Sequence, residues 1–121
     1  MKTILLAEDE ESSVALFEAM VVGHEDWDLL IARTGSQALS LLANRRMDVV
    51  LLDIQLPEPD GLEICRHIKG APETASTFVV MVSAMTQDAS RNEAVQAGAD
   101  KFVAKPFSTT EITSMLEAIL A

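Results

Sequence analysis

The chain has 121 residues, 49% of them hydrophobic and only five of them glycine, which suits one compact domain with its own core. Its formal net charge is −10, and residues 1–60 hold 12 acidic against 4 basic side chains. So acidic a surface disfavours direct nucleic-acid binding, which depends on lysine and arginine. The single cysteine, Cys65, excludes an internal disulfide and suits a reducing cytoplasm, and we expect it to be a small buried or half-buried thiol.

The start of the chain does not have the pattern of an export signal. Lys2 is followed after five further residues by the acidic run Glu8 to Glu11, which leaves too little room for the apolar part of a signal peptide. No apolar stretch approaches the roughly 18 residues that a membrane span needs. We therefore expect a cytoplasmic domain without a membrane segment.

Five short apolar runs have the length and composition of buried strands. Segments with apolar residues three and four positions apart separate them, as in amphipathic helices. Ser36 is a candidate cap for the second helix, Ser108 and Glu111 are spaced as a capping box, and Gly70 and Gly98 are helix stops. The predicted strands are 3–7, 27–32, 48–52, 78–82 and 101–104, and the predicted helices are 11–22, 35–44, 61–69, 87–97 and 108–120.

This alternation predicts an α/β fold in which a doubly wound parallel sheet carries helices on both faces. Five strand–helix units, (βα)5, fit the flavodoxin-like strand order 2-1-3-4-5. No internal repeat, linker or low-complexity tract interrupts residues 1–121, so we expect them to form one domain.

Acidic residues stand at the ends of two predicted strands. Glu8 and Asp9 follow the first strand, and Asp53 follows the third, the unbroken aliphatic run 49–52. Because those two strands are neighbours in the expected order, the three carboxylates share one crevice at the carboxyl edge of the sheet. Like charges so close favour a bound cation, and oxygen ligands favour a hard ion such as Mg²⁺. Glu10 and Glu11 are interpreted instead as the start of a solvated loop that caps the next helix near its positive end.

Ser83 lies one strand–helix unit beyond Asp53, and Lys105 lies a further unit beyond Ser83, so the two residues end the fourth and fifth predicted strands. A lysine and a hydroxyl each suit one oxygen of a phosphoryl group, and a metal suits a third. Phosphoryl transfer depends mainly on such positioning and charge neutralisation. The pattern therefore predicts that Asp53 is a nucleophile that forms an aspartyl phosphate.

From Lys2 to Leu120 the chain resembles a response-regulator receiver domain of two-component signalling. The resemblance is carried by a set of motifs rather than by any one of them: Glu8-Asp9, Asp53 followed by Pro57 and Asp60-Gly61, Ser83-Ala84, Gly98-Ala99-Asp100, and Lys105-Pro106-Phe107.

The resemblance implies further roles. Asp9, Asp53 and the backbone carbonyl of Gln55 would bind Mg²⁺ directly, and Glu8 would act through water. Lys105 would pair with the acids. Ser83 would move towards the phosphoryl group while Phe102, at the position of the family's switch aromatic, turns inward. A cis peptide between Lys105 and Pro106 is also implied, which proline makes feasible.

The departures from the family pattern are small. Leu56 replaces a common methionine, and Glu8 stands where aspartate is frequent. Gln55 and Met85 occupy two positions that flank the phosphoryl group and influence its hydrolysis. Phe102 lacks the hydroxyl of the tyrosine often found there, so a switch would depend on packing alone.

Three rival functions were weighed. An aspartate-nucleophile phosphatase needs a second acid two residues after the nucleophile, where this chain has Gln55. A nucleotide or flavin binder needs a phosphate loop after the first strand, where the acidic residues would repel phosphate. A pseudo-receiver that acts as a protein-interaction module without phosphorylation stays open as the alternative.

The function expected is a phosphorylation-controlled switch in a two-component phosphorelay, and not an enzyme that turns over another substrate. The phosphoryl group would come from a histidine kinase or histidine phosphotransfer protein, in the presence of Mg²⁺. The output would pass to a downstream protein or a fused output domain. The cognate kinase, the output pathway, the phosphoryl lifetime and the oligomeric state are not encoded in any motif of the sequence.

Overall fold

The computed structural model describes residues 1–84 and 88–121, with the backbone alone at 88–90. Five strands and five helices alternate along these residues. The predicted start of the fourth helix, residue 87, lies outside the described residues, and every other boundary agrees with the sequence prediction to within one residue. The strands are β1 (Lys2–Ala7), β2 (Trp27–Ala32), β3 (Val49–Asp53), β4 (Phe78–Ser83) and β5 (Lys101–Ala104). The helices are α1 (Glu11–Val21), α2 (Gly35–Asn44), α3 (Gly61–Gly70), α4 (Asp88–Gln96) and α5 (Thr109–Leu120).

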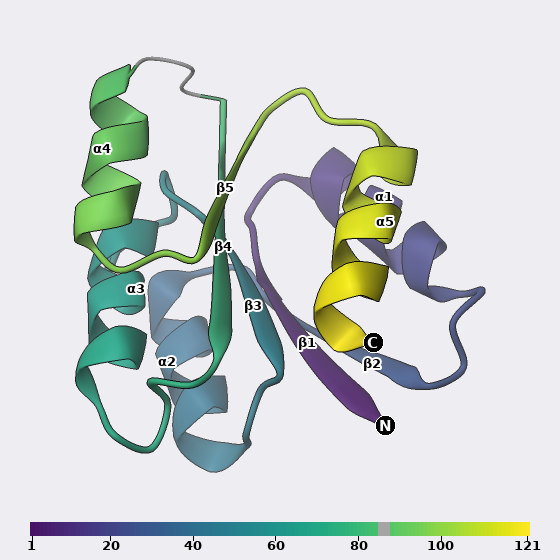
Figure 1. Ribbon diagram of the computed structural model, residues 1–121, viewed down its shortest axis with the longest axis horizontal. Coiled ribbons are helices and arrows are strands. Elements are labelled where there is room, and N and C mark those ends of the chain that lie inside the picture. The colour runs from purple at the N-terminus through teal and green to yellow at the C-terminus, as the bar shows by residue number, and fades with distance from the viewer. Residues whose placement is uncertain (85–87) are drawn as a thin grey trace.

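The strands form one parallel sheet in the order β2-β1-β3-β4-β5. Helices α2, α3 and α4 cover one face of this sheet, and α1 and α5 cover the other (Figure 1). The predicted doubly wound α/β fold with strand order 2-1-3-4-5 is therefore confirmed. The chain reverses its direction of winding between β1 and β3, and in such sheets ligands bind at that point, beyond the carboxyl ends of the strands.

Two apolar cores lie on the two faces of the sheet because alternate residues of each strand point to opposite sides. Leu5, Val50 and Leu52 face the core under α2, α3 and α4, whereas Ile4 and Leu51 face the core under α1 and α5. All five of these side chains are fully buried. Burial on both faces explains why the strands appear in the sequence as continuous aliphatic runs.

The helix ends agree with the predicted caps in part. The Ser108 side chain accepts a hydrogen bond from the Glu111 N–H at the start of α5, as predicted. The prediction of Ser36 as a cap was wrong, because Thr34 caps α2 by accepting from the Gln37 N–H. The helix begins at Gly35, as predicted, and there a Cβ would lie 1.8 Å from the Pro59 carbonyl oxygen.

The amino ends of the strands are tied by side chains. The Thr3 N–H donates to the Asp48 carboxylate at 2.7 Å, which joins β1 to the residue before β3. The Val79 N–H donates to the Asp100 carboxylate at 2.8 Å, and Asp100 also pairs with Lys69 of α3 at 2.7 Å. These bonds fix the end of the sheet opposite to the predicted site.

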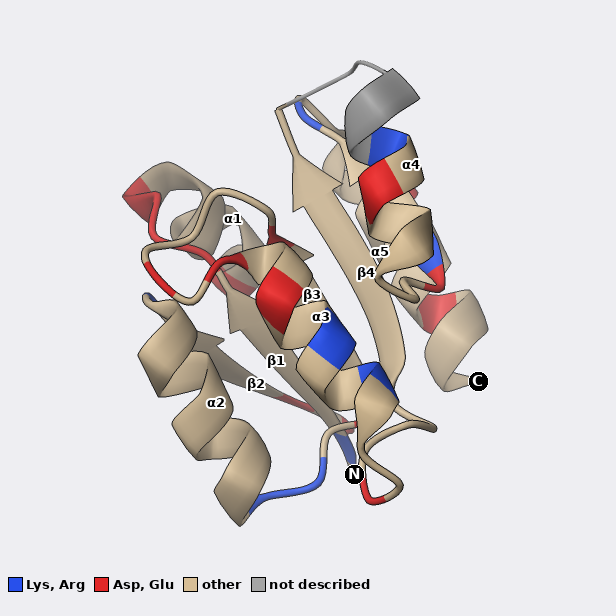
Figure 2. Ribbon diagram, turned by 90° about the vertical axis from the view of Figure 1, so that its left-hand side faces the viewer, with Lys and Arg blue, Asp and Glu red and all other residues tan. Residues whose placement is uncertain are grey.

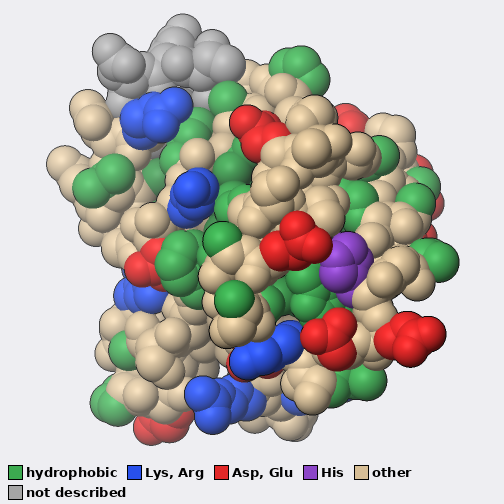
Figure 3. Space-filling model, turned by 45° about the vertical axis from the view of Figure 1, so that its right-hand side comes forward, with side chains coloured by type: hydrophobic (Ala, Val, Ile, Leu, Met, Phe, Trp, Pro, Cys, Tyr) green, Lys and Arg blue, Asp and Glu red, His purple; other side chains and the backbone are tan. Residues whose placement is uncertain are grey.

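The surface around α1 and α5 is mixed in character. Hydrophobic, acidic and basic side chains are interspersed on the face turned to the viewer in Figure 3. Among the helices formed by residues 1–84 and 88–121, none combines the length and the apolar character needed to cross a bilayer.

Candidate functional site

The predicted site residues come together at the carboxyl edge of the sheet. Glu8 and Asp9 directly follow β1, Asp53 is the last residue of β3, Ser83 is the last residue of β4, and Lys105 directly follows β5. These strands are adjacent, so their ends lie beside one another. Acidic residues gather on the loops at this end of the molecule, around the starts of α1 and α3 (Figure 2).

Glu8, Asp9 and Asp53 form a tight acidic cluster. Each offers one carboxylate oxygen, and these three oxygens lie within 4.8 Å of one another. Glu8 is 2% exposed and Asp53 is 7% exposed, whereas Asp9 is open to solvent. Oxygen-only ligands at this spacing fit a hard divalent cation, which would also relieve the repulsion among the acids.

Lys105 neutralises part of this charge. Its Nζ donates to Glu8 Oε1 at 2.7 Å and to Asp53 Oδ2 at 3.2 Å. Burial raises the pKa of the Glu8 carboxyl, and the hydrogen bond from Lys105 only partly opposes this while the charge of Asp53 adds to it. Burial lowers the pKa of Lys105, but the bond to Glu8 and the charge of Asp53 outweigh it, so the pKa is raised and the ammonium stays charged.

Backbone donors hold the second oxygens of the two buried acids. Glu8 Oε2 accepts from the Glu10 N–H at 3.2 Å, and Asp53 Oδ1 accepts from the Gln55 N–H at 2.9 Å. Both oxygens of Glu8 therefore have partners. The Asp53 carboxylate is held at two points and presents a fixed orientation to the crevice.

The backbone behind Asp53 is closely packed. The Gly61 N–H donates to the Ile54 carbonyl at 3.2 Å, and the Asp60 side chain caps α3 by accepting from the Glu63 N–H. A Cβ at Gly61 would lie 2.3 Å from the carbonyl oxygen of Asp53. Only glycine allows the start of α3 to approach the end of β3 this closely.

The two residues expected to act as a switch lie on neighbouring strands. Ser83 is completely buried at the end of β4. Phe102 is half-buried on β5 and packs at the edge of the core under α2, α3 and α4. The guanidinium carbon of Arg91 on α4 lies 4.9 Å from the centroid of the Phe102 ring, so this ring links β5 to α4. Met85 lies outside the described residues.

Two X–Pro peptides are cis. The Lys105–Pro106 bond is cis, as the resemblance implied. The Glu58–Pro59 bond is also cis, which was not predicted.

Glu10 is exposed in the loop before α1, as the sequence indicated. The prediction that it caps this helix was wrong, because its side chain makes no cap hydrogen bond to α1. Its Oε1 instead accepts from the hydroxyls of Ser12 and Ser13, each at 3.0 Å, and these bonds lower the pKa of the Glu10 carboxyl. The serines two and three positions after Glu10 are the feature of the sequence that could have indicated these hydrogen bonds.

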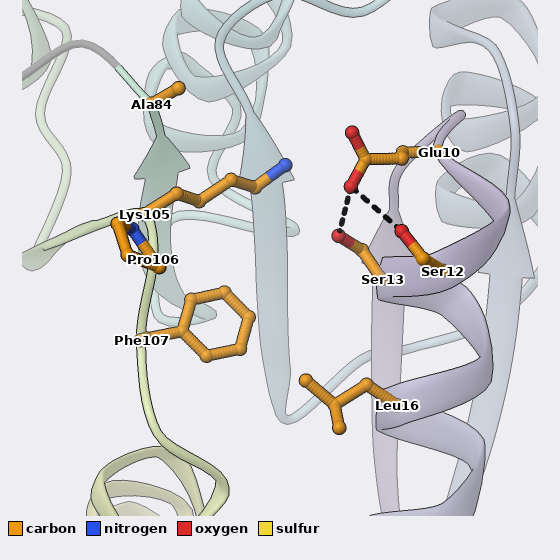
Figure 4. Close-up of a pocket in the computed structure, with 8 residues that line it drawn as sticks. All are labelled: Glu10, Ser12, Ser13, Leu16, Ala84, Lys105, Pro106 and Phe107. Carbon is orange, nitrogen blue, oxygen red and sulfur yellow. Dashed lines mark hydrogen bonds between the residues drawn. The ribbon is translucent and has the colours of Figure 1, made fainter.

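This carboxylate borders a cavity of about 440 Å³ between α1 and the segment after β5. Lys105 reaches across from the opposite wall, and the Phe107 ring and Leu16 form the apolar side below (Figure 4). Lys105 belongs to both the cavity and the acidic cluster, so the two are continuous.

Residues 4–117 match the response regulator receiver domain family. The chain belongs to this family. It is 30% identical over 119 residues to the transcriptional regulatory protein ResD of Bacillus subtilis, which covers 98% of this chain and 48% of ResD. The chain thus spans about half the length of the curated relatives it matches.

Solved receiver domains have the same fold. The BeF3-activated receiver domain of DrrB from Thermotoga maritima matches with a TM-score of 0.88 and 27% identity, over 99% of this chain and 97% of that one. The receiver domain of the sensor histidine kinase PA1611 from Pseudomonas aeruginosa matches with a TM-score of 0.87 and 27% identity, over 99% and 98%. That structure holds a magnesium ion coordinated in its active site cleft.

The matched family is a signalling domain of two-component systems rather than an enzyme family, and two-component signalling implies a histidine kinase partner. The receiver domain of this chain carries an acidic cluster consistent with a divalent metal site.

Proposed function

We propose that this chain is a phosphorylation-controlled switch that accepts a phosphoryl group from a phosphohistidine donor onto Asp53. The supporting observation is the setting of the Asp53 carboxylate, which lies at the carboxyl end of the central strand between Lys105 and the acids that follow β1. Asp53 is almost fully buried, yet one of its oxygens belongs to the group that can bind a metal ion.

The transfer step is a displacement at phosphorus. An oxygen of Asp53 attacks the phosphorus, the bond from phosphorus to the donor nitrogen breaks, and its electron pair leaves with the imidazole ring. Lys105, already 3.2 Å from Asp53 Oδ2, is placed to pair with an oxygen of the transferred group. The Ser83 hydroxyl would donate to another of these oxygens.

Asp9, Asp53 and the backbone carbonyl of Gln55 would hold Mg²⁺, and Glu8 would act through water. The indirect role of Glu8 is supported by its hydrogen bonds, because Lys105 and the Glu10 N–H already engage its two oxygens. Bound Mg²⁺ would supply positive charge that balances the carboxylates and the phosphoryl oxygens.

The readout would be a rearrangement of Ser83 and Phe102. A phosphoryl group at Asp53 would draw the Ser83 hydroxyl towards it, and the space vacated would admit the Phe102 ring. Because the ring now lies against Arg91, its inward turn would remove a contact between β5 and α4. The face made by α4, β5 and α5 would change accordingly.

We further propose that residues 1–121 act as one receiver domain in the cytoplasm. A histidine kinase or histidine phosphotransfer protein would donate the phosphoryl group, docking near α1 and the Pro106 loop. A downstream protein or a fused output domain would recognise the changed face, without direct nucleic-acid contact by this domain.

The test is intact mass spectrometry after incubation with acetyl phosphate, with and without Mg²⁺. Wild type should gain one phosphoryl group only with Mg²⁺, and Asp53→Asn should gain none. Asp26→Asn, a substitution of an exposed acid outside the cluster, is the matched control and should behave as wild type. If wild type gains no adduct at short times and binds no beryllofluoride, the chain is instead a pseudo-receiver that acts by protein interaction.

A further inference from the structure

The cavity beside the acidic cluster contains a fixed charge that the transfer step above does not use. Glu10 lies on the α1 side of this cavity, and Lys105 faces it from the other side (Figure 4). The remaining lining is largely apolar and includes Leu16, Pro106 and Phe107. A donor that delivers a phosphoryl group to Asp53 brings its leaving group into this space, because Lys105 contacts both the cavity and Asp53.

The Glu10 carboxylate is held in place. The Ser12 and Ser13 hydroxyls both donate to its Oε1 at 3.0 Å, which leaves Oε2 for a further donor. Ser13 itself is 8% exposed, so one of the two anchors is buried. A negative charge held by two hydroxyls, in a cavity whose opposite side includes Pro106 and Phe107, suits a ligand that is flat and carries a positive N–H group.

The apolar wall is fixed as well. The Phe107 ring packs edge-on against Phe17 of the core, with ring centroids 5.6 Å apart. Phe17 is 1% exposed, so Phe107 rests on a buried residue. An aromatic ring and a carboxylate that line one cavity favour a cationic heterocycle, through contact with the ring and a charge-assisted hydrogen bond.

We propose that Glu10 binds the protonated imidazole ring of the phosphohistidine donor and thereby makes Asp53 prefer nitrogen-linked phosphoryl donors to acyl phosphates. This role rests on the function proposed above and names the donor chemistry of the same site. Glu10 accepts the N–H of the ring nitrogen that does not carry the phosphoryl group.

The step balances without any further reactant. The donor ring enters as an imidazolium, with the phosphoryl group on one nitrogen and a proton on the other. Asp53 forms the new oxygen–phosphorus bond, the nitrogen–phosphorus bond breaks, and its electron pair stays on the ring. The ring keeps its other proton and leaves as neutral imidazole. Acetyl phosphate has no cationic ring for Glu10 to bind and releases an acetate anion, so Glu10 repels its leaving group.

The experiment compares two small donors on the full chain with Mg²⁺. Phosphoimidazole and acetyl phosphate are each incubated with wild type, Glu10→Gln and Glu11→Gln, and the rate of adduct formation at Asp53 is followed by intact mass. Glu11 is the matched control because it is adjacent, carries the same charge, pairs with Arg33, and does not line the cavity. A thermal melt of each variant confirms that it is folded.

In Glu10→Gln we expect phosphoimidazole to react about threefold more slowly and acetyl phosphate about threefold faster, so their rate ratio falls roughly tenfold. Glu11→Gln should keep the wild-type ratio. An unchanged ratio in Glu10→Gln, or an equal fall in Glu11→Gln, overturns the role of Glu10 and leaves the proposed function standing. If neither donor labels wild type, the proposed function fails and this role fails with it.

Discussion

Replacing Glu8 by glutamine should stabilise the metal-free domain. At an effective dielectric constant of about 20, the 2.7 Å contact with Lys105 is worth about 6 kcal/mol of attraction. Repulsion from Asp9 and Asp53, whose oxygens lie within 4.8 Å, is at least about 3.5 kcal/mol each. Attraction and repulsion therefore nearly cancel. The cost of burying a carboxylate that is 2% exposed then decides whether the charge of Glu8 stabilises or destabilises the metal-free domain.

Glutamine at position 8 avoids most of this burial cost and can still accept a hydrogen bond from Lys105. It loses one acceptor for the Glu10 N–H, which costs about 1 kcal/mol. We expect a net gain of about 1–2 kcal/mol in the free energy of unfolding at pH 7. For 121 residues this raises the melting temperature by about 4–8 °C.

The dependence on pH has a definite sign. Because the pKa of Glu8 is raised in the folded state, its contribution to stability is fully present below the pKa of the unfolded chain and is lost as the pH rises through the folded value. The stability advantage of Glu8→Gln over wild type should therefore grow as the pH rises from the unfolded-state pKa of Glu8 through its folded-state pKa.

The assay is urea or thermal unfolding with a chelator, repeated with Mg²⁺. Glu18→Gln removes an exposed charge on α1 and should change the stability by less than about 0.5 kcal/mol. Mg²⁺ should stabilise wild type more than Glu8→Gln. A metal-free Glu8→Gln protein less stable than wild type by 1 kcal/mol or more, as measured against that control, would mean that the attraction to Lys105 dominates and that our reasoning is wrong.

Three further predictions concern Lys105, Gly61 and Cys65. Lys105→Met should slow labelling of Asp53 by acetyl phosphate at least about tenfold, and an unchanged rate by intact mass would contradict the charge-pairing role of Lys105. Gly61→Ala should lower the free energy of unfolding by at least about 2 kcal/mol. Gly70→Ala, whose Cβ would meet nothing within 4 Å, should be neutral or mildly stabilising. Equal urea midpoints for the two variants would refute the close approach at Gly61. Burial raises the pKa of the Cys65 thiol to about 11, so its reaction with a thiol reagent at pH 8 should be about a hundredfold slower in the native protein than in urea.

The sequence predicted the acidic cluster because its signal is local. An aliphatic strand that ends in an acid fixes where the acid lies, and the strand order then places Asp53 beside Glu8 and Asp9. The contact of Lys105 with both buried acids follows from the same register. The strands and helices were likewise readable because apolar spacing marks both kinds of element.

Other features depend on contacts between distant segments and left no local signal. The start of α2 is set by the approach of the Pro59 carbonyl to Gly35, so Thr34 and not Ser36 caps the helix. The Glu58–Pro59 cis peptide belongs to the same contact region. Glu10 is the exposed loop residue that the sequence indicated, but its bonds to two hydroxyls were not predicted, because a carboxylate with such bonds looks the same in a sequence as one that contacts water alone.

The side-chain hydrogen bonds at the amino ends of the strands hold the sheet together at the edge opposite to the acidic cluster. Asp48, Asp100 and Lys69 fasten neighbouring strands at the edge away from the acids. The contacts that hold the strands in register therefore lie at the edge opposite to the one where the like-charged carboxylates gather. Outside the close contacts at Gly35, Pro59 and Gly61, a protein engineer could vary the loops at the acidic edge to alter donor or ion preference while the opposite edge preserves strand register. Substitutions at Asp48 or Asp100 would reduce that tolerance.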